Sequence, residues 1–518
     1  MPREMGALIE ELMLSDNTPD KEGYYREVMQ SILETGQADA MIIALSRVIQ
    51  ALAIDRLHII GDIFDRGPRA DLIMDALENY HQVDVQWGNH DIAWMGAAAL
   101  SEACIAQVIV TSVKYGNLET LEVGYGISLR PLSTLASTCY AGDPCAEFLP
   151  RDNGEDLHED EMELARMHKA AAILQFKLEG QLLARHPEYG MESRRLLHCI
   201  DFEKQTVCVD GEEYALRSCH FPTIDPADPY ALTPLEREVM DRLVLEFAHS
   251  EKLQRHIQFL YSTGGMYLRC NGNLLYHGCI PMEEDGSFAP IPVSVDQPLR
   301  GREGIDAADL LARRGYFSNL GTPERENGQD FLWYLGCGPY SPLVGKSKMA
   351  TFERYFIKDK KPHVEIKNTY YSYQDDEDTA LRILKEFELA DTGFIINGHV
   401  PVKLGKGESP IKAGGRLLVI DGGLSRAYQP VTGIAGYTLI FSSHELSLVA
   451  HQPFESKANA IRAELDIHSV HEIVKVMEHR LLIADTDDGE ALRGRIDDLM
   501  LLISAYRSGV IKESRGEN

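Results

Sequence analysis

Apolar residues recur at helical spacing between residues 20 and 53, in DKEGYYREVMQSILETGQADAMIIALSRVIQALA, and this spacing predicts helices. The apolar run Leu57–Ile60 then predicts a strand that ends at Gly61. The segment RADLIMDALENY predicts a helix, and VDVQW predicts a second strand that ends at Gly88. Strand, loop, helix, strand and loop make one βαβ unit, with both loops beyond strand ends. Ligands of open α/β sheets bind at this edge of the sheet.

Three later apolar runs end in the same manner. NLLYHGCIP places His277 after such a run, TGFIINGHVPV places His399 there, and RLLVIDGG places Asp421 there. One such coincidence would carry little weight. Several in one chain predict an α/β fold in which the strand ends share one site.

The length and spacing of the segments suggest how the chain is organised. The interval between Asp91 and His277 is far too long for a loop, and its middle part is strongly helical, so we expect an inserted helical subdomain. Residues 281–356 are rich in Gly and Pro and are expected to be irregular. The expected parts are a helical amino-terminal segment at 1–53, a first part of the core at 54–129, a helical insertion at 130–262, a second part of the core at 263–455, and a helical carboxy-terminal tail at 456–518.

The charge balance restricts the class of partner. The chain has 80 acidic and 51 basic residues, a formal net charge of -29. This excess of acid argues against nucleic-acid and anionic-membrane partners, so a local basic cluster must hold any anionic substrate. We find no apolar run near the ~18 residues of a membrane span. Nine scattered cysteines without a C-x-x-C pair favour a cytoplasmic protein with reduced thiols. The sequence leaves open whether the chain forms a homo-oligomer.

The two loops of the βαβ unit carry metal-ligand and phosphate chemistry. GDIFDRG offers Asp62, a carboxylate able to bridge two cations, and Arg66, a bidentate phosphate donor. GNHD offers Asn89 as a neutral oxygen ligand, and His90 beside Asp91 as a general acid steered by a carboxylate. Each motif alone has a commoner explanation, such as a turn, a core histidine or a helix cap. Their joint order makes a shared site the better interpretation.

The combined donor set indicates a class of metal. His277 and His399 would add imidazole to the carboxylate and amide oxygens of the two loops. This mixture suits Mn²⁺, Fe²⁺ or Zn²⁺ better than Ca²⁺. Two such ions roughly 3.5–4 Å apart would activate a hydroxide and stabilise an in-line displacement at phosphorus.

The motifs GDxxDRG, GNHD, HG and GH, in this order, resemble those of the calcineurin-like metallophosphatases, whose fold is a β-sandwich flanked by helices. Longer segments are similar to the class 3 fructose-1,6-bisphosphatases of Firmicutes and related bacteria, from about residue 20 onward. These segments are HIIGDIFDRGPRADLIMD, VDVQWGNHDIAWMGAA, YGISLRPL, LLYHGCIPM, YSPLVGKSKMATFERYFI and GHVPVKLGKGESPIKAGGRLLVIDGGLSRAYQPVTGIAGYTLI.

The resemblance implies a reaction and a role for each residue. The reaction is hydrolysis of the 1-phosphate of fructose 1,6-bisphosphate in gluconeogenesis, with Mn²⁺ as the expected metal. Arg66 would bind the phosphate, and His90 with Asp91 would serve proton transfer. The implied metal ligands are Asp62, Asn89, His277 and His399.

Basic residues near the site motifs are candidates for holding the substrate phosphates. Clusters of lysine and arginine in a chain of net charge -29 suggest a phosphate pocket, although a solvated charged face would look the same. The candidates for substrate binding are Lys346, Lys348, Arg354, Lys403, Lys406 and Arg426.

One expected motif has no match in the expected place. Metallophosphatases carry D-x-H after a strand upstream of GDxxDRG. The two D-x-H tripeptides here, Asp156-Leu157-His158 and Asp466-Ile467-His468, lie downstream, and neither is assigned. We therefore expect a chain that lacks an amino-terminal segment, with activity impaired by the loss of that loop. Met1 and Met5, in the helical REMGALIEELML, suit an internal start.

Other functions remain to be weighed. A degenerate relative with one metal, or a non-catalytic protein that binds metal or sugar phosphate, would also lack D-x-H. A protein phosphatase or a dinucleoside tetraphosphatase is less favoured, because those enzymes lack the helical insertion and the segment SPLVGKSKMATFERYF.

Overall fold

The computed structural model describes residues 5–14, 19–151, 160–294, 298–426, 428–433, 436–452, 456–463 and 469–511. The contacts between residues divide the chain into two units. One comprises Met1–Ile59 and Ala76–Asp84, and the other comprises Ile60–Asp75 and Val85–Asn518. Within the described residues no helix has the length and the apolar content that a bilayer span requires.

The smaller unit is mainly helical. It contains α1 (Gly6–Leu14), α2 (Pro19–Glu34), α3 (Ala38–Ala53) and the strand β1 (Leu57–Ile59). This confirms the helices predicted between residues 20 and 53 and the strand after them. The core of the unit is formed by side chains from all three helices, namely Ile9, Ile32, Met41, Ala44 and Val48. The elements α4 (Ala70–Glu78) and β2 (Val83–Gln86), both predicted, each contain residues of both units.

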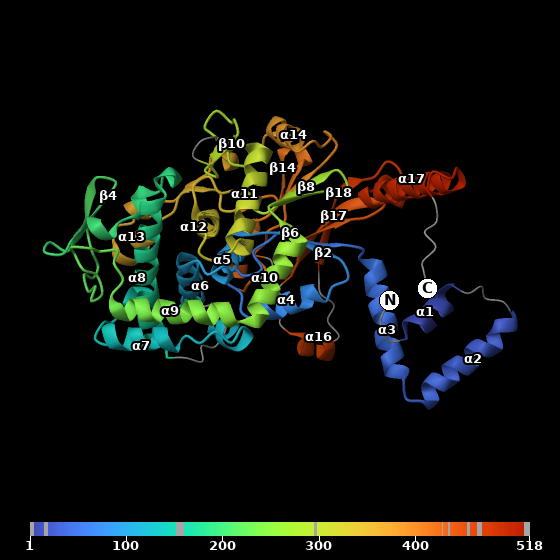
Figure 1. The fold of residues 1–518 in the computed structure, drawn as a ribbon, viewed down its shortest axis with the longest axis horizontal. Coiled ribbons are helices and arrows are strands. Elements are labelled where there is room, and N and C mark those ends of the chain that lie inside the picture. Colours follow the sequence, from blue (N-terminus) through green and yellow to red (C-terminus); the bar gives the residue numbers. More distant parts are fainter. Residues whose placement is uncertain are drawn as a thin grey trace. The chain divides into compact units, whose positions relative to one another are not determined.

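A group of helices fills one end of the larger unit (Figure 1). The buried helix α8 contacts α6 and α7, and α9 contacts α6 and α7 as well. Buried residues cover almost the whole circumference of α8, and the charged ones among them, Lys169, Lys177 and Glu179, are paired with opposite charges. Beside these helices lies an antiparallel sheet of β3, β4 and β5. The elements of this part are α5 (Asn89–Ala98), α6 (Glu102–Lys114), α7 (Arg130–Cys139), α8 (Glu161–Arg185), β3 (Ile200–Asp201), β4 (Thr206–Val209), β5 (Glu212–Ala215), α9 (Pro234–His249) and α10 (Glu251–Thr263).

A five-stranded sheet, in the order β14-β15-β13-β8-β7, carries the second set of site loops. Its strands are β7 (Tyr267–Cys270), β8 (Asn273–Tyr276), β13 (Ile395–Asn397), β14 (Ile411–Lys412) and β15 (Leu417–Val419). β13 pairs in parallel with both β8 and β15, so the three strands end at one edge. The end of β2 pairs in parallel with β6 (Gly264–Gly265). The strands predicted before His277, His399 and Asp421 are thus confirmed, as is the α/β class.

Part of the segment expected to be irregular is helical. After β9 (Pro290–Ile291) and β10 (Leu299–Arg300), the chain forms α11 (Gly301–Phe317) and α12 (Pro323–Cys337). The expectation of irregular structure is wrong here because two of the glycines, Gly315 and Gly328, lie inside helices and serve packing rather than turns. A Cβ on Gly315 would lie 2.6 Å from the carbonyl carbon of Gly328, so α11 and α12 touch backbone to backbone. The following elements are β11 (Lys346–Lys348), α13 (Phe352–Phe356), β12 (Ile366–Lys367) and α14 (Glu377–Glu386).

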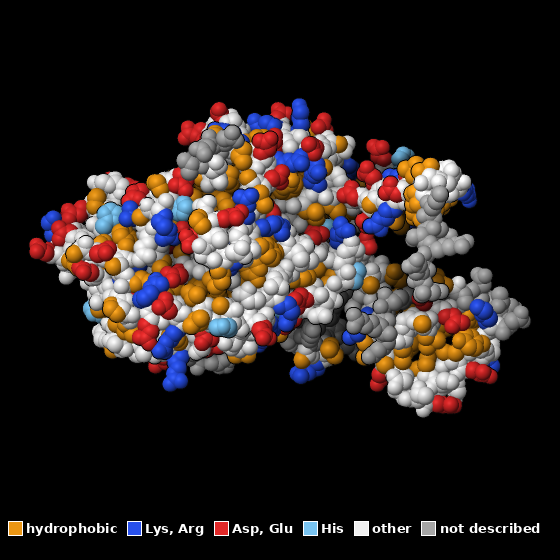
Figure 2. Space-filling model, in the orientation of Figure 1, with side chains coloured by type: hydrophobic (Ala, Val, Ile, Leu, Met, Phe, Trp, Pro, Cys, Tyr) orange, Lys and Arg blue, Asp and Glu red, His pale blue; other side chains and the backbone are white. Residues whose placement is uncertain are grey.

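The tail is not wholly helical as expected. α15 (Gln429–Thr432) precedes the tail. Within it α16 (Lys457–Ala463) and α17 (Asp487–Arg507) are helices, but residues 469–476 form a strand, β18 (Ser469–Val476). β18 pairs antiparallel with β17 (Glu445–His451), which also pairs with β16 (Gly436–Phe441). The open edge of β17 supplies hydrogen-bond partners that a helix would not use. On the face in Figure 2, acidic and basic side chains are interspersed over the larger unit.

Candidate metal centre

Asp62 and His399 occupy unusual backbone conformations. Their φ angles are 57° and 67°, in the left-handed region that side chains other than glycine seldom adopt. Asp62 follows Gly61, and His399 follows Gly398 at the end of β13. Strained residues of this kind are concentrated at functional sites. Both are among the predicted metal ligands.

Two glycines allow the loops to approach each other closely. A Cβ on Gly61 would lie 2.6 Å from the carbonyl oxygen of Gln86 and 2.7 Å from Nδ1 of His277. A Cβ on Gly88 would lie 2.9 Å from Cγ of Asp62. The Gly-Asp and Gly-Asn pairs of the sequence are therefore explained by the space that Asp62 and His277 require.

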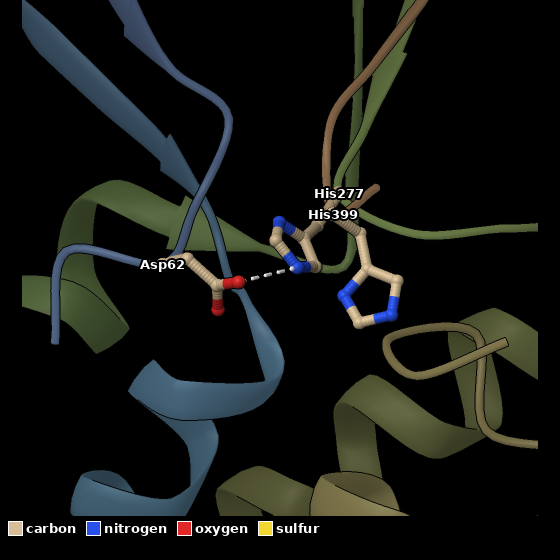
Figure 3. Close-up of side chains that lie close together, drawn as sticks. All are labelled: Asp62, His277 and His399. Carbon is tan, nitrogen blue, oxygen red and sulfur yellow. Dashed lines mark ion pairs between the residues drawn. The ribbon is translucent and has the colours of Figure 1, made fainter. Parts of the chain in front are cut away.

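The structure brings Asp62, His277 and His399 together, each with a ligand atom within 4.8 Å of the others (Figure 3). Nε2 of His277 lies 3.3 Å from Oδ2 of Asp62, and the two imidazole rings are 5.2 Å apart. Nδ1 of His277 donates to the carbonyl oxygen of Ile60 at 2.7 Å. A histidine fixed in this way presents its other nitrogen to a metal.

Several buried polar atoms here lack hydrogen-bond partners within the described part of the chain. They are Oδ1 of Asn89, Nε2 of His277 and Nδ1 of His399. Asn89 lies between Gly88 and His90, and the backbone N–H of His90 donates to Asp62 at 3.1 Å. Buried polar atoms without partners are costly, and a divalent cation would satisfy all of them together with the carboxylate. The residues thus fit a transition-metal ion.

Burial and the neighbouring charges have opposing effects on the pKa values of Asp62 and His277. Burial would raise the pKa of Asp62, but the neighbouring imidazoles of His277 and His90 lower it below its usual range. Burial lowers the pKa of His277, yet the Asp62 carboxylate outweighs this and raises it to about 9. Burial, with the charge of His277, lowers the pKa of His399 to about 3. His399 is therefore neutral near pH 7, with a lone pair ready for a metal.

The partner of His90 is Asp65. Nε2 of His90 lies 3.0 Å from Oδ1 of Asp65, and Nε of Arg66 lies 3.6 Å from the same oxygen. Burial would lower the pKa of His90, but the carboxylates of Asp65 and Asp62 raise it to about 9. His90 therefore carries a proton near neutral pH, as a general acid must. His90, Asp62 and Asp65 also form a second group of ligand atoms within 4.8 Å of one another.

The expectation that Asp91 steers His90 is wrong. The carboxylate of Asp91 is fully buried and accepts from the backbone N–H groups of Asp62 at 2.8 Å, Phe64 at 3.2 Å and Gly88 at 2.9 Å. It caps the first turn of α5 and joins the two loops. Adjacent residues of a helix point in different directions, so the neighbour of His90 in sequence is not its neighbour in space.

Arg66 lies between two tyrosines that the sequence reasoning missed. Its guanidinium carbon lies 4.3 Å from the ring centroid of Tyr428 and 5.1 Å from that of Tyr115. Both tyrosines are distant in sequence from Arg66, so no local pattern marked them. Asp421, shortly after β15, is half-buried, and this burial raises the pKa of its carboxyl to about 6.

Three of the predicted phosphate-binding residues have carboxylate partners. Lys346 lies 2.8 Å and Arg354 lies 3.1 Å from the carboxylate of Glu365, and Lys348 pairs with Asp210. These cations are therefore at least partly neutralised within the chain. The charge of Lys346 still contributes to the lowered pKa of His399.

The other three candidates for phosphate binding are half-buried or exposed, and the two D-x-H tripeptides are not among the described residues. Lys403 is half-buried, whereas the side chains of Lys406 and Arg426 are exposed. The described contacts join none of the three to the metal-ligand candidates. The D-x-H tripeptides Asp156-Leu157-His158 and Asp466-Ile467-His468 fall outside the described residues.

Comparison with known proteins identifies the family. The model of the family described as Firmicute fructose-1,6-bisphosphatase matches residues 1–508. A fructose-1,6-bisphosphatase class 3 of Alkaliphilus metalliredigens is 52% identical over 520 residues, which cover 99% of this chain and 78% of the relative. Proteins of the same name from Clostridium acetobutylicum and Bacteroides thetaiotaomicron are 51% and 50% identical over 518 residues, with the same coverage of both chains. No solved structure matches the chain significantly. This chain therefore belongs to the Firmicute fructose-1,6-bisphosphatase family.

Proposed function

We propose that this chain hydrolyses fructose 1,6-bisphosphate to fructose 6-phosphate and phosphate, as a metal-dependent enzyme of gluconeogenesis in the cytoplasm. The observation that carries the proposal is the meeting of Asp62, His277 and His399 at the ends of separate strands, in a chain of this family. Carboxylate and imidazole ligands with buried, unpartnered atoms are what a phosphatase metal centre needs.

The proposed metal is Mn²⁺, held by Asp62, Asn89, His277 and His399. When bound, the ion would polarise a phosphoryl oxygen and lower the pKa of a water. Imidazole with carboxylate and amide oxygen suits Mn²⁺ but also Fe²⁺ and Zn²⁺, so metal identity is decided by reconstitution with each ion in turn.

The chain's own residues supply phosphate binding and proton transfer in this proposal. Arg66, held between Tyr115 and Tyr428, binds the 1-phosphate through its guanidinium. His90, kept protonated by Asp65, donates a proton to the departing sugar alkoxide. Asp91 positions the two loops through its hydrogen bonds to their backbone and does not transfer the proton itself.

We also propose that the fold is that of the calcineurin-like metallophosphatases, a β-sandwich flanked by helices. The order of the four motifs and the placement of their residues at strand ends support this. The parallel pairs of β2 with β6, and of β13 with β8 and β15, would be the cores of the two sheets.

A comparison of substrates tests the function. With Mn²⁺ present, phosphate release is measured from fructose 1,6-bisphosphate, a dinucleoside tetraphosphate and a phosphopeptide. We expect the highest kcat/KM for fructose 1,6-bisphosphate. A preference for either other substrate would favour a different metallophosphatase, and binding of the sugar without turnover would favour a non-catalytic protein.

A further inference from the structure

Lys114, the last residue of α6, is a half-buried cation near the metal centre without a carboxylate partner in the described part of the chain. Its ammonium lies 5.4 Å from the ring centroid of Tyr355 and 6.0 Å from that of Tyr115. The other buried lysines of this unit differ. Lys169 lies 2.5 Å from Asp143, and Lys177 lies 2.7 Å from Glu236. A partly buried ammonium without such a partner is expensive and calls for an explanation.

Two further cations surround the same tyrosine ring. The guanidinium of Arg66 lies 5.1 Å and that of Arg151 lies 5.9 Å from the ring centroid of Tyr115. The backbone N–H of Arg151 donates to the carbonyl oxygen of Lys114 at 2.8 Å, which fixes the two chain segments side by side. The buried ring of Tyr115 thus gathers three positive charges in one place.

Nearby carboxylates are already engaged. Glu365, whose carboxylate raises the pKa of Lys114, pairs with Lys346 and Arg354. Asp65 is shared between His90 and Arg66. Burial, reinforced by the charges of Arg151, Arg66 and Arg354, lowers the pKa of Lys114 to about 8. The cluster therefore has an excess of positive charge in a chain whose net charge is -29.

The alternative is that Lys114 only packs against the tyrosines. Packing needs the aliphatic stem but gains nothing from three mutually repelling charges. A bisphosphate would satisfy all three donors, with one phosphate on Arg66 and the other on Lys114 and Arg151, and Arg66 connects the cluster to the metal centre through Asp65.

We propose that Lys114 and Arg151, next to Arg66, form the subsite for the second phosphate of the sugar bisphosphate, the one that is not cleaved. This rests on the proposed function and adds to it the residues that distinguish a bisphosphate from a monophosphate. The three cations converge on the ring of Tyr115, and one of them is Arg66, the phosphate-binding arginine of the centre.

The test compares two ligands on the whole chain. Steady-state phosphate release with Mn²⁺ present measures the KM, taken as the apparent Kd, of fructose 1,6-bisphosphate and of fructose 1-phosphate for the wild type, Lys114→Gln and Arg151→Gln. We expect either substitution to weaken bisphosphate binding by about 10- to 100-fold, the effect of losing one charge-assisted hydrogen bond. Binding of fructose 1-phosphate should change less than about twofold, because that ligand lacks the second phosphate.

Two variants serve as controls. Lys361→Gln removes a lysine charge that Glu212 already matches, and it should leave both affinities unchanged. Lys114→Arg keeps the charge and should retain most of the preference for the bisphosphate. A variant that loses affinity but melts at the wild-type temperature has lost the subsite and not the fold.

Several results would overturn the inference. Equal weakening for both ligands would mean that the residues support the centre as a whole, and no change for the bisphosphate would mean that Lys114 only packs. Hydrolysis of fructose 1,6-bisphosphate by the wild type is measured in parallel. If the wild type hydrolyses the sugar and the variants bind it as tightly as the wild type, only the proposed subsite is rejected. If the wild type neither binds nor hydrolyses the sugar, the proposed function is rejected as well.

Discussion

At the scale of single residues, hydrogen bonds hold two metal-ligand candidates in strained backbone conformations. A non-glycine residue at positive φ costs about 1–3 kcal/mol. Asp62 and His399 both have this conformation, with φ of 57° and 67°. Three backbone donors to Asp91 and the bond from His277 to Ile60 fix the loops around them. The surrounding contacts therefore determine the positions of the ligand atoms before any metal arrives.

His168 provides a pH-dependent contribution to stability away from the centre. It is buried on α8, where Nδ1 donates to the carbonyl oxygen of Phe148 and Nε2 accepts from the hydroxyl of Tyr355, both at 2.9 Å. Burial lowers its pKa to about 4. Because the unfolded chain protonates first, near its ordinary value of about 6.5, stability is lost as pH falls from about 6.5 to 4 and no further below.

We predict a loss of about 2 kcal/mol from this residue between about pH 7 and pH 5, from the difference between the two pKa values. Urea unfolding of the wild type and of His168→Gln at both pH values measures it. The variant should be less stable at pH 7 but lose less stability on acidification. Equal losses in both proteins would show that His168 does not titrate in this way.

At the scale of elements, glycines decide how close the loops and helices come. Gly88 allows the start of α5 to pack against Asp62, and Gly315 allows α11 to touch α12. The first glycine serves the site and the second the scaffold. A substitution of Gly88 should therefore change metal binding, whereas a substitution of Gly315 should change stability.

Gly88→Ala is predicted to weaken metal binding by about 10- to 100-fold, as for groups that orient metal ligands. The added methyl would lie 2.9 Å from Cγ of Asp62 and displace the carboxylate. Metal affinity is measured by titration with Mn²⁺, with Gly142→Ala as control, since a Cβ on Gly142 meets nothing within 4 Å. Wild-type metal affinity in Gly88→Ala would contradict the assigned role of Asp62.

The strands and loops of the site were predictable from sequence because their signals are local. An apolar run followed by Gly or His marked β8 and β13, and the structure places His277 and His399 together as expected. The predictions that were wrong concern residues whose structure depends on partners distant in sequence. β18 forms because β17 offers an edge, and His90 pairs with Asp65, from the first loop, and not with Asp91, beside it in sequence. Lys114 was not predicted for the same reason, since Tyr355, Arg66 and Arg151 come from separate segments.

At the scale of the whole molecule, the net charge of -29 opposes an anionic substrate, while the cations near the centre attract it. For binding an anionic substrate, the position of the positive charges matters more than the net charge of the chain. Several basic residues that the sequence suggested are paired with acids, whereas Lys114 and Arg151, beside Tyr115, have no carboxylate partner among the described residues. Membership of the family and the geometry of the centre thus point to the same reaction.

The most direct test of this account is release of phosphate from fructose 1,6-bisphosphate by this chain with Mn²⁺ added, beside Asp62→Asn. The account predicts turnover by the wild type that requires the metal. It predicts a loss of at least about 1,000-fold in the variant, because the carboxylate between the two groups of ligand atoms is gone. A folded, metal-loaded wild type that releases no phosphate, or equal release by the variant, would contradict it.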